Sequence, residues 1–302
     1  MMMETPGATG RLRRETTEAQ PLRTVLSWEL RRLSVDHFGW AMAGAALLLF
    51  VALLWFKHFW MVQVSDGGAR FQVLGSSADG MLLEIVFVLL LLFGMFLPFV
   101  AAEGVARDYK LHVHELLMAT SMPGWAYVGG RYLAGLVVSI ALALELLLAA
   151  FLVNSGLHLS QPGYPAPDLA ALLAAWAITV LPGAVLLGSA SFALGTLWPR
   201  RATILKLGVL IVWVAFFIVD PSSLPTWFAD WNPTSNSLAA TSERQMATQF
   251  KQHGQTLAAA RAAQAQLPDM QQWLLPHFGL IAIGLLLALA TVAGFRRFRA
   301  VL

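Results

Sequence analysis

The sequence predicts an all-α integral membrane protein with six transmembrane helices, an amphipathic interfacial helix before them, and a helical extracytoplasmic loop between spans five and six. Hydrophobic residues make up 58% of the chain and charged residues only 12%, whereas soluble globular domains carry roughly a quarter charged residues. The charges gather at the termini and in a few connections, and long uncharged runs separate them. Both observations indicate that lipid surrounds most of the chain.

The first residues are polar and lack the apolar stretch that a secretory signal requires. We expect residues 1–20 to form a disordered cytoplasmic tail. Beyond them, apolar residues such as Leu22, Val25 and Leu30 recur at helical spacing, with charged residues between them. This pattern predicts an amphipathic helix over residues 21–37 that lies in the membrane interface.

Six apolar runs follow and predict a transmembrane domain over residues 38–302. Most of them are long enough, at about 18 residues or more, to cross the hydrocarbon core. The fifth reaches that length only if it includes Lys206, whose long side chain can extend to the interface. The predicted spans cover residues 39–56, 85–102, 132–153, 169–199, 203–219 and 273–295; residues 61–80 form a polar loop, and a longer loop over 220–272 holds one or two exposed helices.

The distribution of basic residues predicts the orientation of the chain. An even number of spans places both termini on one side, and that side carries fifteen Lys and Arg residues, against four in the opposite loops. Because basic residues concentrate in cytoplasmic loops, we expect both termini to be cytoplasmic. The same rule explains the basic sequence pI of about 9.5 without a nucleic-acid partner.

The sequence lacks the common catalytic motifs. It contains no phosphate-binding loop of the G-x-x-x-x-G-K-[ST] type, no G-x-S-x-G nucleophile elbow and no H-E-x-x-H zinc motif. Cysteine is absent, which excludes disulfides and thiolate metal sites. His112 and His114 stand two residues apart, so on a helix they point to different faces and cannot chelate one ion. We therefore predict no catalytic residue and no metal site.

The connection between spans two and three is the most informative segment. It begins with Glu103, mixes charged and apolar residues, and is expected to form one or two short helices that stop at Pro123. Trp125 and Tyr127 suit the depth of the membrane interface, and Arg131 precedes the third span. An ordinary connection whose charged side chains extend to water explains Arg131 and Trp125. It does not explain the compact acidic and apolar mixture of Asp108, Glu115, Leu116 and Leu117.

This connection resembles the signature of ATP-binding-cassette transporter permeases of the type-2 exporter family. In that family, an acid at the inner end of span two leads to a basic-acidic pair, an E-L-L-like stretch, A-T, a proline, an aromatic residue, and a glycine with a basic residue that opens span three. The residues that match this order are Glu103, Arg107, Asp108, Glu115, Leu116, Leu117, Ala119, Thr120, Pro123, Tyr127, Gly130 and Arg131. The six spans and the amphipathic first helix agree with it over about residues 21–302.

The resemblance implies that residues 104–122 contain a coupling helix that docks on a separate cytoplasmic ATPase, which binds ATP and magnesium. Asp108, Lys110 and Glu115 would make polar contacts with it, and Leu116, Leu117 and Met118 would fill a groove. The resemblance also implies a second permease copy or a related permease, in the inner or plasma membrane of a prokaryote. The expected coupling residues are Glu103, Arg107, Asp108, Glu115, Leu116, Leu117 and Pro123, and those at the opening of span three are Trp125, Tyr127, Gly130 and Arg131.

Two further features lie within the predicted spans. Glu145 is the one acid well inside a span, and it is either a functional intramembrane group or a carboxyl that is hydrogen-bonded for packing. Small residues along span four, among them Gly188, Ser189 and Gly195, predict tight helix packing or a subunit interface. A carrier that works alone and uses Glu145, and a membrane-embedded enzyme that uses His112, His114 and Glu115, remain alternatives to the exporter permease. The substrate and the role of the 220–272 loop stay open.

Overall fold

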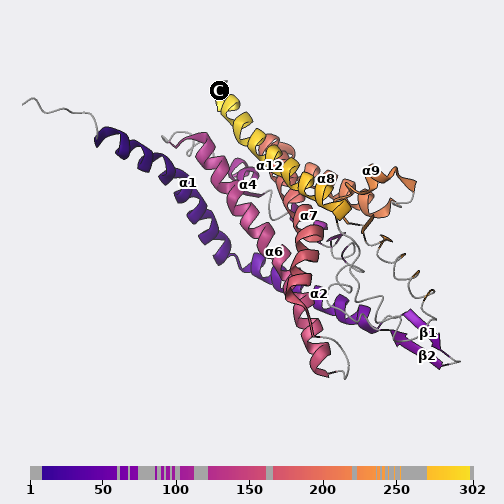
Figure 1. Cartoon of the computed structure of the whole chain (residues 1–302). Helices are drawn as coiled ribbons and strands as arrows, with labels where there is room; N and C mark the ends of the chain where they lie inside the picture. Colours follow the sequence, from indigo (N-terminus) through magenta and orange to yellow (C-terminus); the bar gives the residue numbers. More distant parts are fainter. Residues whose placement is uncertain are drawn as a thin grey trace, which may run out of the picture.

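The computed structural model describes residues 9–59, 62–66, 69–73, 103–111, 122–160, 166–219, 223–235 and 271–299, together with single positions and short stretches between 86 and 98 and between 237 and 252. Long helices dominate this part of the chain (Figure 1). The elements are α1 (Thr9–Val35), α2 (His37–Phe59), β1 (Val62–Asp66), β2 (Ala69–Val73), α4 (Glu103–Lys110), α6 (Gly124–Ser160), α7 (Leu169–Leu197), η1 (Pro199–Arg201), α8 (Ala202–Ile218), α9 (Thr226–Ala229) and α12 (Gln271–Arg299).

Five segments of the described chain are helical, long and apolar enough to cross a membrane. They lie in α2, α6, α7, η1 with α8, and α12, at the positions of the first, third, fourth, fifth and sixth predicted spans. The chain is therefore an α-helical multi-pass membrane protein. Most of the second predicted span, residues 85–102, lies outside the described residues; the positions that are described there, including Leu90 and Gly94, are helical.

The first helix begins earlier than the sequence suggested. We expected a disordered tail over residues 1–20 and a helix over 21–37, but α1 starts at Thr9, runs through Pro21 and ends at Val35. Arginine, glutamate, alanine and glutamine, which fill much of residues 11–20, are good helix formers and sustain this extension. Only Asp36 separates α1 from α2, and its carbonyl accepts the backbone N–H of Trp40 (3.1 Å), as at the start of a helix.

One part of the described chain departs from an all-α architecture. Strands β1 and β2, within the predicted polar loop over residues 61–80, form an antiparallel hairpin in which Val62 pairs with Val73 and Asp66 with Ala69. The sequence carried a signal for it: residues of opposite character alternate in V-Q-V-S and in R-F-Q-V, and two glycines follow Asp66. This combination favours a two-residue hairpin connection.

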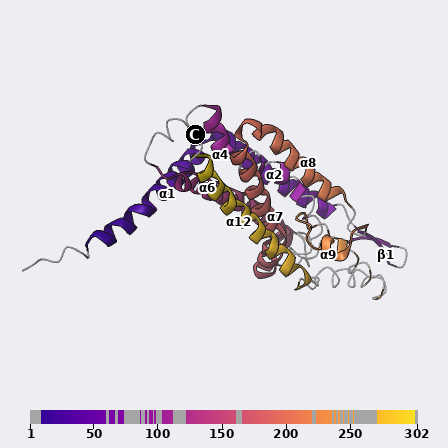
Figure 2. The same ribbon diagram turned by 90° about the horizontal axis from the view of Figure 1, so that it is seen from above.

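The long helices form one bundle with alternating directions (Figures 1 and 2). Helices α2, α6 and α8 run away from the end of the bundle that holds α4 and η1, and α7 and α12 run toward it. We call this end the α4 end and the opposite one the α9 end. The N-terminus of α7, at the end of the helix that lies farther from α4, is capped by Asp168, whose Oδ1 accepts the N–H groups of Ala170 (2.8 Å) and Ala171 (3.2 Å).

Small residues let the helices approach closely. A Cβ on Gly188 of α7 would stand 2.8 Å from Oγ of Ser139 on α6, and one on Gly284 of α12 would stand 3.1 Å from Cα of Leu186 on α7. Ser189 of α7 hydrogen-bonds to the hydroxyl of Tyr132 on α6 (3.0 Å). The small residues of span four thus serve tight packing inside the chain, which is one of the two roles that their spacing predicted.

The second span, where it is described, packs against α8. The indole Nε1 of Trp213 donates to the carbonyl of Leu90 (2.9 Å), and a Cβ on Gly94 would stand 2.1 Å from that same nitrogen. Glycine at this position is what admits the indole. Both sides of the contact belong to a core shared with α2, α6 and α7, in which Phe50, Leu146 and Trp176 are buried.

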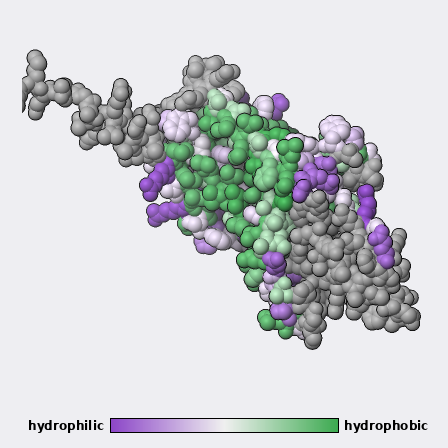
Figure 3. All heavy atoms as spheres, in the orientation of Figure 1, coloured by the Kyte–Doolittle hydropathy of each residue, from purple (hydrophilic) through white to green (hydrophobic). Residues whose placement is uncertain are grey.

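Large apolar side chains cover the outside of the bundle. On the face in Figure 3, hydrophobic side chains gather over the middle of the bundle and hydrophilic ones lie toward its edges. Ile204, Ile211 and Ile218 of α8 are each about 70% exposed, as are Leu286 and Leu289 of α12 at 63% and 66%. Such an exposed apolar belt is expected where lipid tails replace water.

Candidate functional site

The candidate site lies at the α4 end, where α6 begins. The carbonyl of Pro123 accepts the backbone N–H groups of Ala126 (3.0 Å) and Tyr127 (3.2 Å), so α6 starts directly after this proline. We expected the third span to begin at residue 132, but its helix already includes Trp125, Tyr127, Gly130 and Arg131. No proline interrupts this stretch, and it continues into the apolar run. Tyr127 and Arg131 stand four residues apart and therefore share one face of α6.

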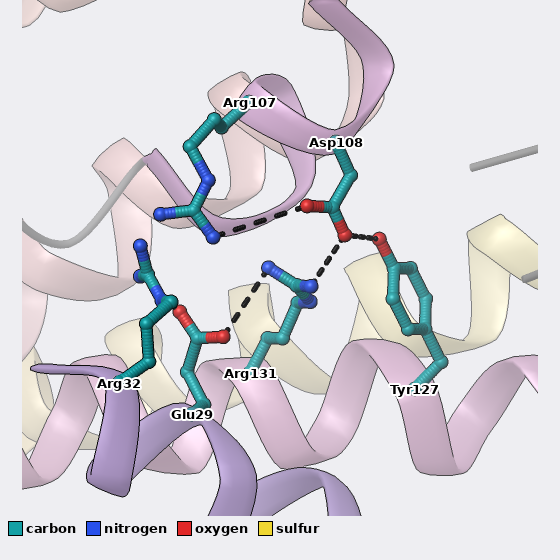
Figure 4. A network of polar contacts seen from close by, with 6 residues as sticks. All are labelled: Glu29, Arg32, Arg107, Asp108, Tyr127 and Arg131. Atoms are coloured by element: carbon teal, nitrogen blue, oxygen red, sulfur yellow. Dashed lines mark hydrogen bonds and ion pairs between the residues drawn. The ribbon is translucent and has the colours of Figure 1, made fainter. Parts of the chain in front are cut away.

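Arg131 is held between two carboxylates from two other helices (Figure 4). Its Nη2 pairs with Oδ2 of Asp108 on α4, and its Nη1 lies 3.4 Å from Oε2 of Glu29 on α1. All three residues are only 3% exposed. The ion pairs therefore join α1, α4 and α6 at a point from which water is largely excluded.

Further groups complete this network. The hydroxyl of Tyr127 donates to Oδ2 of Asp108 (2.7 Å), and Arg32 pairs with Glu29 one turn away on α1. Arg107 contributes a longer contact, with its Nη2 3.9 Å from Oδ1 of Asp108. Aromatic rings flank the guanidinium of Arg131: its Cζ lies 4.9 Å from the ring centre of Tyr127 and 5.5 Å from that of Trp28. These contacts stabilise a cation that has lost most of its hydration.

The packing below the charges explains why α1 can reach α6. A Cβ on Gly130 would stand 2.8 Å from Cβ of Val25 on α1, closer than real Cβ contacts come. Val25 is itself buried. Glycine at residue 130 therefore permits the approach of α1, and that approach places Glu29 beside Arg131.

Helix α4 has a second attachment. Nε of Arg200, in the short helix η1 between α7 and α8, donates to the hydroxyl of Tyr109 (2.6 Å). The guanidinium also lies over the Tyr109 ring, with 5.7 Å from Cζ to the ring centre. Because Tyr109 follows Asp108 directly, α4 is fastened to α6 and α1 through one residue and to the α7–α8 connection through the next.

The structure brings together several of the predicted site residues. Arg107, Asp108, Tyr127 and Arg131 all belong to the network. Asp108, which we expected to contact a partner protein, instead faces inward and pairs with Arg131 inside the chain, because the buried guanidinium offers a stronger partner than water would.

The other predicted residues fall into two groups. Glu103 is the first residue of α4, and Trp125 is half-buried in the first turn of α6. Glu115, Leu116 and Leu117 lie outside the described residues, as do His112 and His114.

Sequence reasoning missed Glu29, Arg32 and Trp28. Glu29 lies four residues after Val25 and seven after Leu22, on the same face of α1 as both. An acid on the apolar face of an amphipathic helix indicates a buried ion pair. The sequence could have identified Glu29 as one member of such a pair, but it could not identify Arg131 as the other. Arg32 and Trp28 then follow as neighbours of Glu29 and Arg131.

Glu145 lies midway along α6, where it is half-buried. Its Oε2 is buried and makes no hydrogen bond to any described residue. Ala141 and Leu148, one turn away on either side, are exposed on the lipid side of the bundle. A carboxyl in this position has no nearby charge to pair with among the described residues, in contrast to Arg131.

The network contains two acids, Glu29 and Asp108. Within the part of the chain that the structure describes, no group of three or more His, Asp or Glu side chains lies close enough to hold a metal ion. The two carboxylates of the network are separated by the guanidinium that they share. What this arrangement can do is fix three helices relative to one another.

The chain matches no family model, and a search of curated proteins finds no match either.

Proposed function

We propose that this membrane protein is the permease subunit of an ATP-driven exporter of the ATP-binding-cassette type. A separate cytoplasmic ATPase docks on residues 104–122, and a second copy of this chain or a related permease completes the transport path. Closure of the ATPase on ATP pushes α4, and the attached spans then switch access from one side of the membrane to the other. The resemblance of residues 103–131 to type-2 exporter permeases supports this assignment.

The observation that carries the proposal is the double attachment of α4. Asp108 joins it to Arg131 and thereby to α6 and α1, and Tyr109 joins it to Arg200 between α7 and α8. A push on the segment that follows α4 would therefore move the ends of several spans together. A buried ion pair suits this task, because separating its charges inside the protein is costly and the helices must move as a unit.

The test is affinity purification through a tag on this chain, from membranes of its native host, followed by assay of ATP hydrolysis in the eluate. We expect an ATPase to co-purify with the wild-type chain. Glu115→Arg, and the double variant Leu116→Asp with Leu117→Asp, should abolish both co-purification and ATP hydrolysis, because they place charges where the partner groove is expected.

The matched control is Arg244→Glu. It reverses an exposed charge in the 220–272 loop, which we expect on the opposite side of the membrane, so the ATPase should still co-purify. Purification of the wild-type chain without an ATPase, or loop variants that bind it as well as the wild type does, would overturn the proposal.

A second candidate function rests on Glu145. A half-buried intramembrane carboxyl whose Oε2 finds no hydrogen bond among the described residues suits a carrier that moves protons without ATP. Purified chain in liposomes loaded with a pH-sensitive dye tests it under an imposed membrane potential. Proton entry that Glu145→Gln abolishes, and that Thr291→Ala leaves unchanged, would favour the carrier; no proton entry would exclude it.

A further inference from the structure

Helix α7 contains a proline, Pro182, halfway along its length. Proline has no N–H group, so the carbonyl of Ile178, four residues earlier, has no partner inside the helix. Ile178 is half-buried in a helix long and apolar enough to span the membrane, where an unpaired carbonyl is costly. Its partner must therefore come from another part of the protein.

Two side chains from outside α7 contact carbonyls of this turn. Nδ1 of His277 on α12 lies 2.5 Å from the carbonyl of Ile178, and the acceptor is a carbonyl, so Nδ1 carries the proton and donates. Oγ of Ser235 donates to the carbonyl of Thr179 (3.1 Å). His277 is 3% exposed and Ser235 only 1%. The turn of α7 that precedes Pro182 is thus joined to α12 and to the chain that follows α9.

Residues 231–235, which we call the latch segment, fold tightly against three helices. Oδ1 of Asn232 accepts the backbone N–H (2.9 Å) and the hydroxyl (2.7 Å) of Thr234, and Nδ2 of Asn232 donates to the carbonyl of Phe216 near the end of α8 (3.0 Å). Ser235 reaches α7 as described above. The segment therefore satisfies backbone carbonyls of two different helices.

Glycines make room for the latch segment on both sides. A Cβ on Gly183, next to the proline, would stand 2.7 Å from the carbonyl oxygen of Pro233. A Cβ on Gly279 of α12 would stand 2.4 Å from the ring of Trp231. The segment thus reaches from the α9 end to the middle of α7, and the two glycines permit contact that other residues would block.

The latch segment also carries backbone strain. Ser235 has φ of 55°, in the left-handed region that residues other than glycine rarely adopt. A residue persists there when its surroundings hold it, and here the hydrogen bond to Thr179 and nearly complete burial do so. The hydrogen bond to Thr179 and the burial of Ser235 therefore hold the segment in a conformation that it would not keep without them.

We propose that the latch segment and His277 form a latch that holds α7 at the turn before Pro182, where proline makes the helix easiest to bend, and that its release lets the half of α7 that precedes the proline swing away from α8 and α12. Access to the middle of α7 from the α9 end is then controlled by two hydrogen bonds. This device goes beyond the exporter function and does not depend on an ATPase, so it is tested on the purified chain alone.

The absence of cysteine from the sequence makes the test direct. Ala229→Cys places a thiol at a position that is 5% exposed, two residues before the latch segment, and Trp227→Cys places one at a position that is 69% exposed. In detergent, a maleimide should label the second variant fast and the first slowly. Ser139→Cys, at the fully buried contact between α6 and α7, reports loosening of the bundle as a whole.

Removing a latch bond should release the segment locally. We expect His277→Ala to accelerate labelling at Ala229→Cys about tenfold. This factor corresponds to the loss of one hydrogen bond that contributes about 1.4 kcal/mol, near the upper end of the usual range. Labelling at Ser139→Cys should stay slow. Thr291→Ala is the matched control, because it deletes another buried hydrogen bond of α12, made to the carbonyl of Leu287 in the same helix, and it should change neither rate.

The decisive variant is Pro182→Ala. It restores the backbone N–H group that pairs with the carbonyl of Ile178 inside α7, so it should release the latch by itself. Adding His277→Ala should then cause no further acceleration of labelling at Ala229→Cys. Unchanged labelling in His277→Ala would overturn the proposal. So would accelerations that multiply in the double variant, or a parallel rise at Ser139→Cys, because each outcome assigns these residues to general packing.

Discussion

The guanidinium of Arg131 and the carboxylate of Asp108 form an ion pair between α6 and α4 in which both side chains are almost completely buried. Glu29 of α1 lies on the other side of the same guanidinium, 3.4 Å from Nη1. One cation is thus shared by two anions from two helices, and each helix position depends on it. The stability of this end of the bundle should therefore respond strongly to residue 131.

Replacing Arg131 by Gln should destabilise the protein by about 3–5 kcal/mol, because it leaves two buried carboxylates without their common partner. Thermal unfolding in detergent measures the effect. Arg32→Gln is the control: Arg32 also pairs with Glu29, but its side chain is 28% exposed, so we expect a loss of at most about 1 kcal/mol. Equal shifts in unfolding temperature for the two variants would contradict the central role of Arg131.

Tyr127→Phe should cost about 1–2 kcal/mol, since it deletes the hydrogen bond to the Asp108 carboxylate and keeps the ring against Arg131. In an Asp108→Asn background the same change should cost less, because the charged acceptor is already gone. A double-mutant cycle on thermal stability measures this coupling. Strictly additive losses would show that the hydroxyl and the carboxylate act independently.

Gly130→Ala should push α1 away from α6, because the new Cβ would meet Val25 at 2.8 Å. We expect a loss of about 1–3 kcal/mol, as for other overpacked contacts. Gly156→Ala on the same helix is the matched control: its Cβ would have no neighbour within 4 Å, so it should stabilise α6 by up to about 1 kcal/mol. Thermal unfolding of the two variants should therefore shift in opposite directions, and a shift in the same direction would refute the steric argument.

The contact between Tyr109 and Arg200 predicts a functional effect that rests on the exporter proposal. Arg200→Gln should leave the ATPase bound but reduce ATP hydrolysis by the complex about fivefold, the effect of one lost hydrogen bond of about 1 kcal/mol. The neighbouring Arg201→Gln, at an exposed position of the same short helix, should hydrolyse ATP at the wild-type rate. The assay is ATP turnover of the co-purified complex; if both arginine variants retain wild-type turnover, η1 does not transmit the motion.

The predicted spans agree with the helices wherever the structure describes them, because an uncharged apolar run of sufficient length has few alternatives to a membrane helix. Helix α7, predicted over 169–199, ends at Leu197. Helix starts were harder to predict: the polar sequence before residue 21 and the stretch from Gly124 to Arg131 are helical without being apolar. Such helix starts depend on helix propensity and on a preceding proline, and a hydropathy profile measures neither of these.

The candidate site was predicted only in part, for a physical reason. Asp108, Tyr127 and Arg131 lie close together in the sequence and stood out in one motif, whereas Glu29 is brought to Arg131 only by the packing of α1 on Gly130. The latch segment shows the same limit, since the separation between Ser235 and Thr179 hides their hydrogen bond from any local pattern. Contacts between distant segments require the three-dimensional arrangement.

Because α6 is long, a small tilt about Arg131 displaces its far end by a large distance. The helix has 37 residues and Arg131 lies in its second turn, so about 44 Å of rigid rod extends from this residue to Ser160, at 1.5 Å per residue. A tilt of roughly 5° about Arg131 would displace the far end by about 4 Å, whereas the ion pairs beside the pivot would change by only a small fraction of that distance. Arg131 thus lies near the pivot of such a tilt, and a small displacement at the α4 end corresponds to a much larger one at the far end of α6.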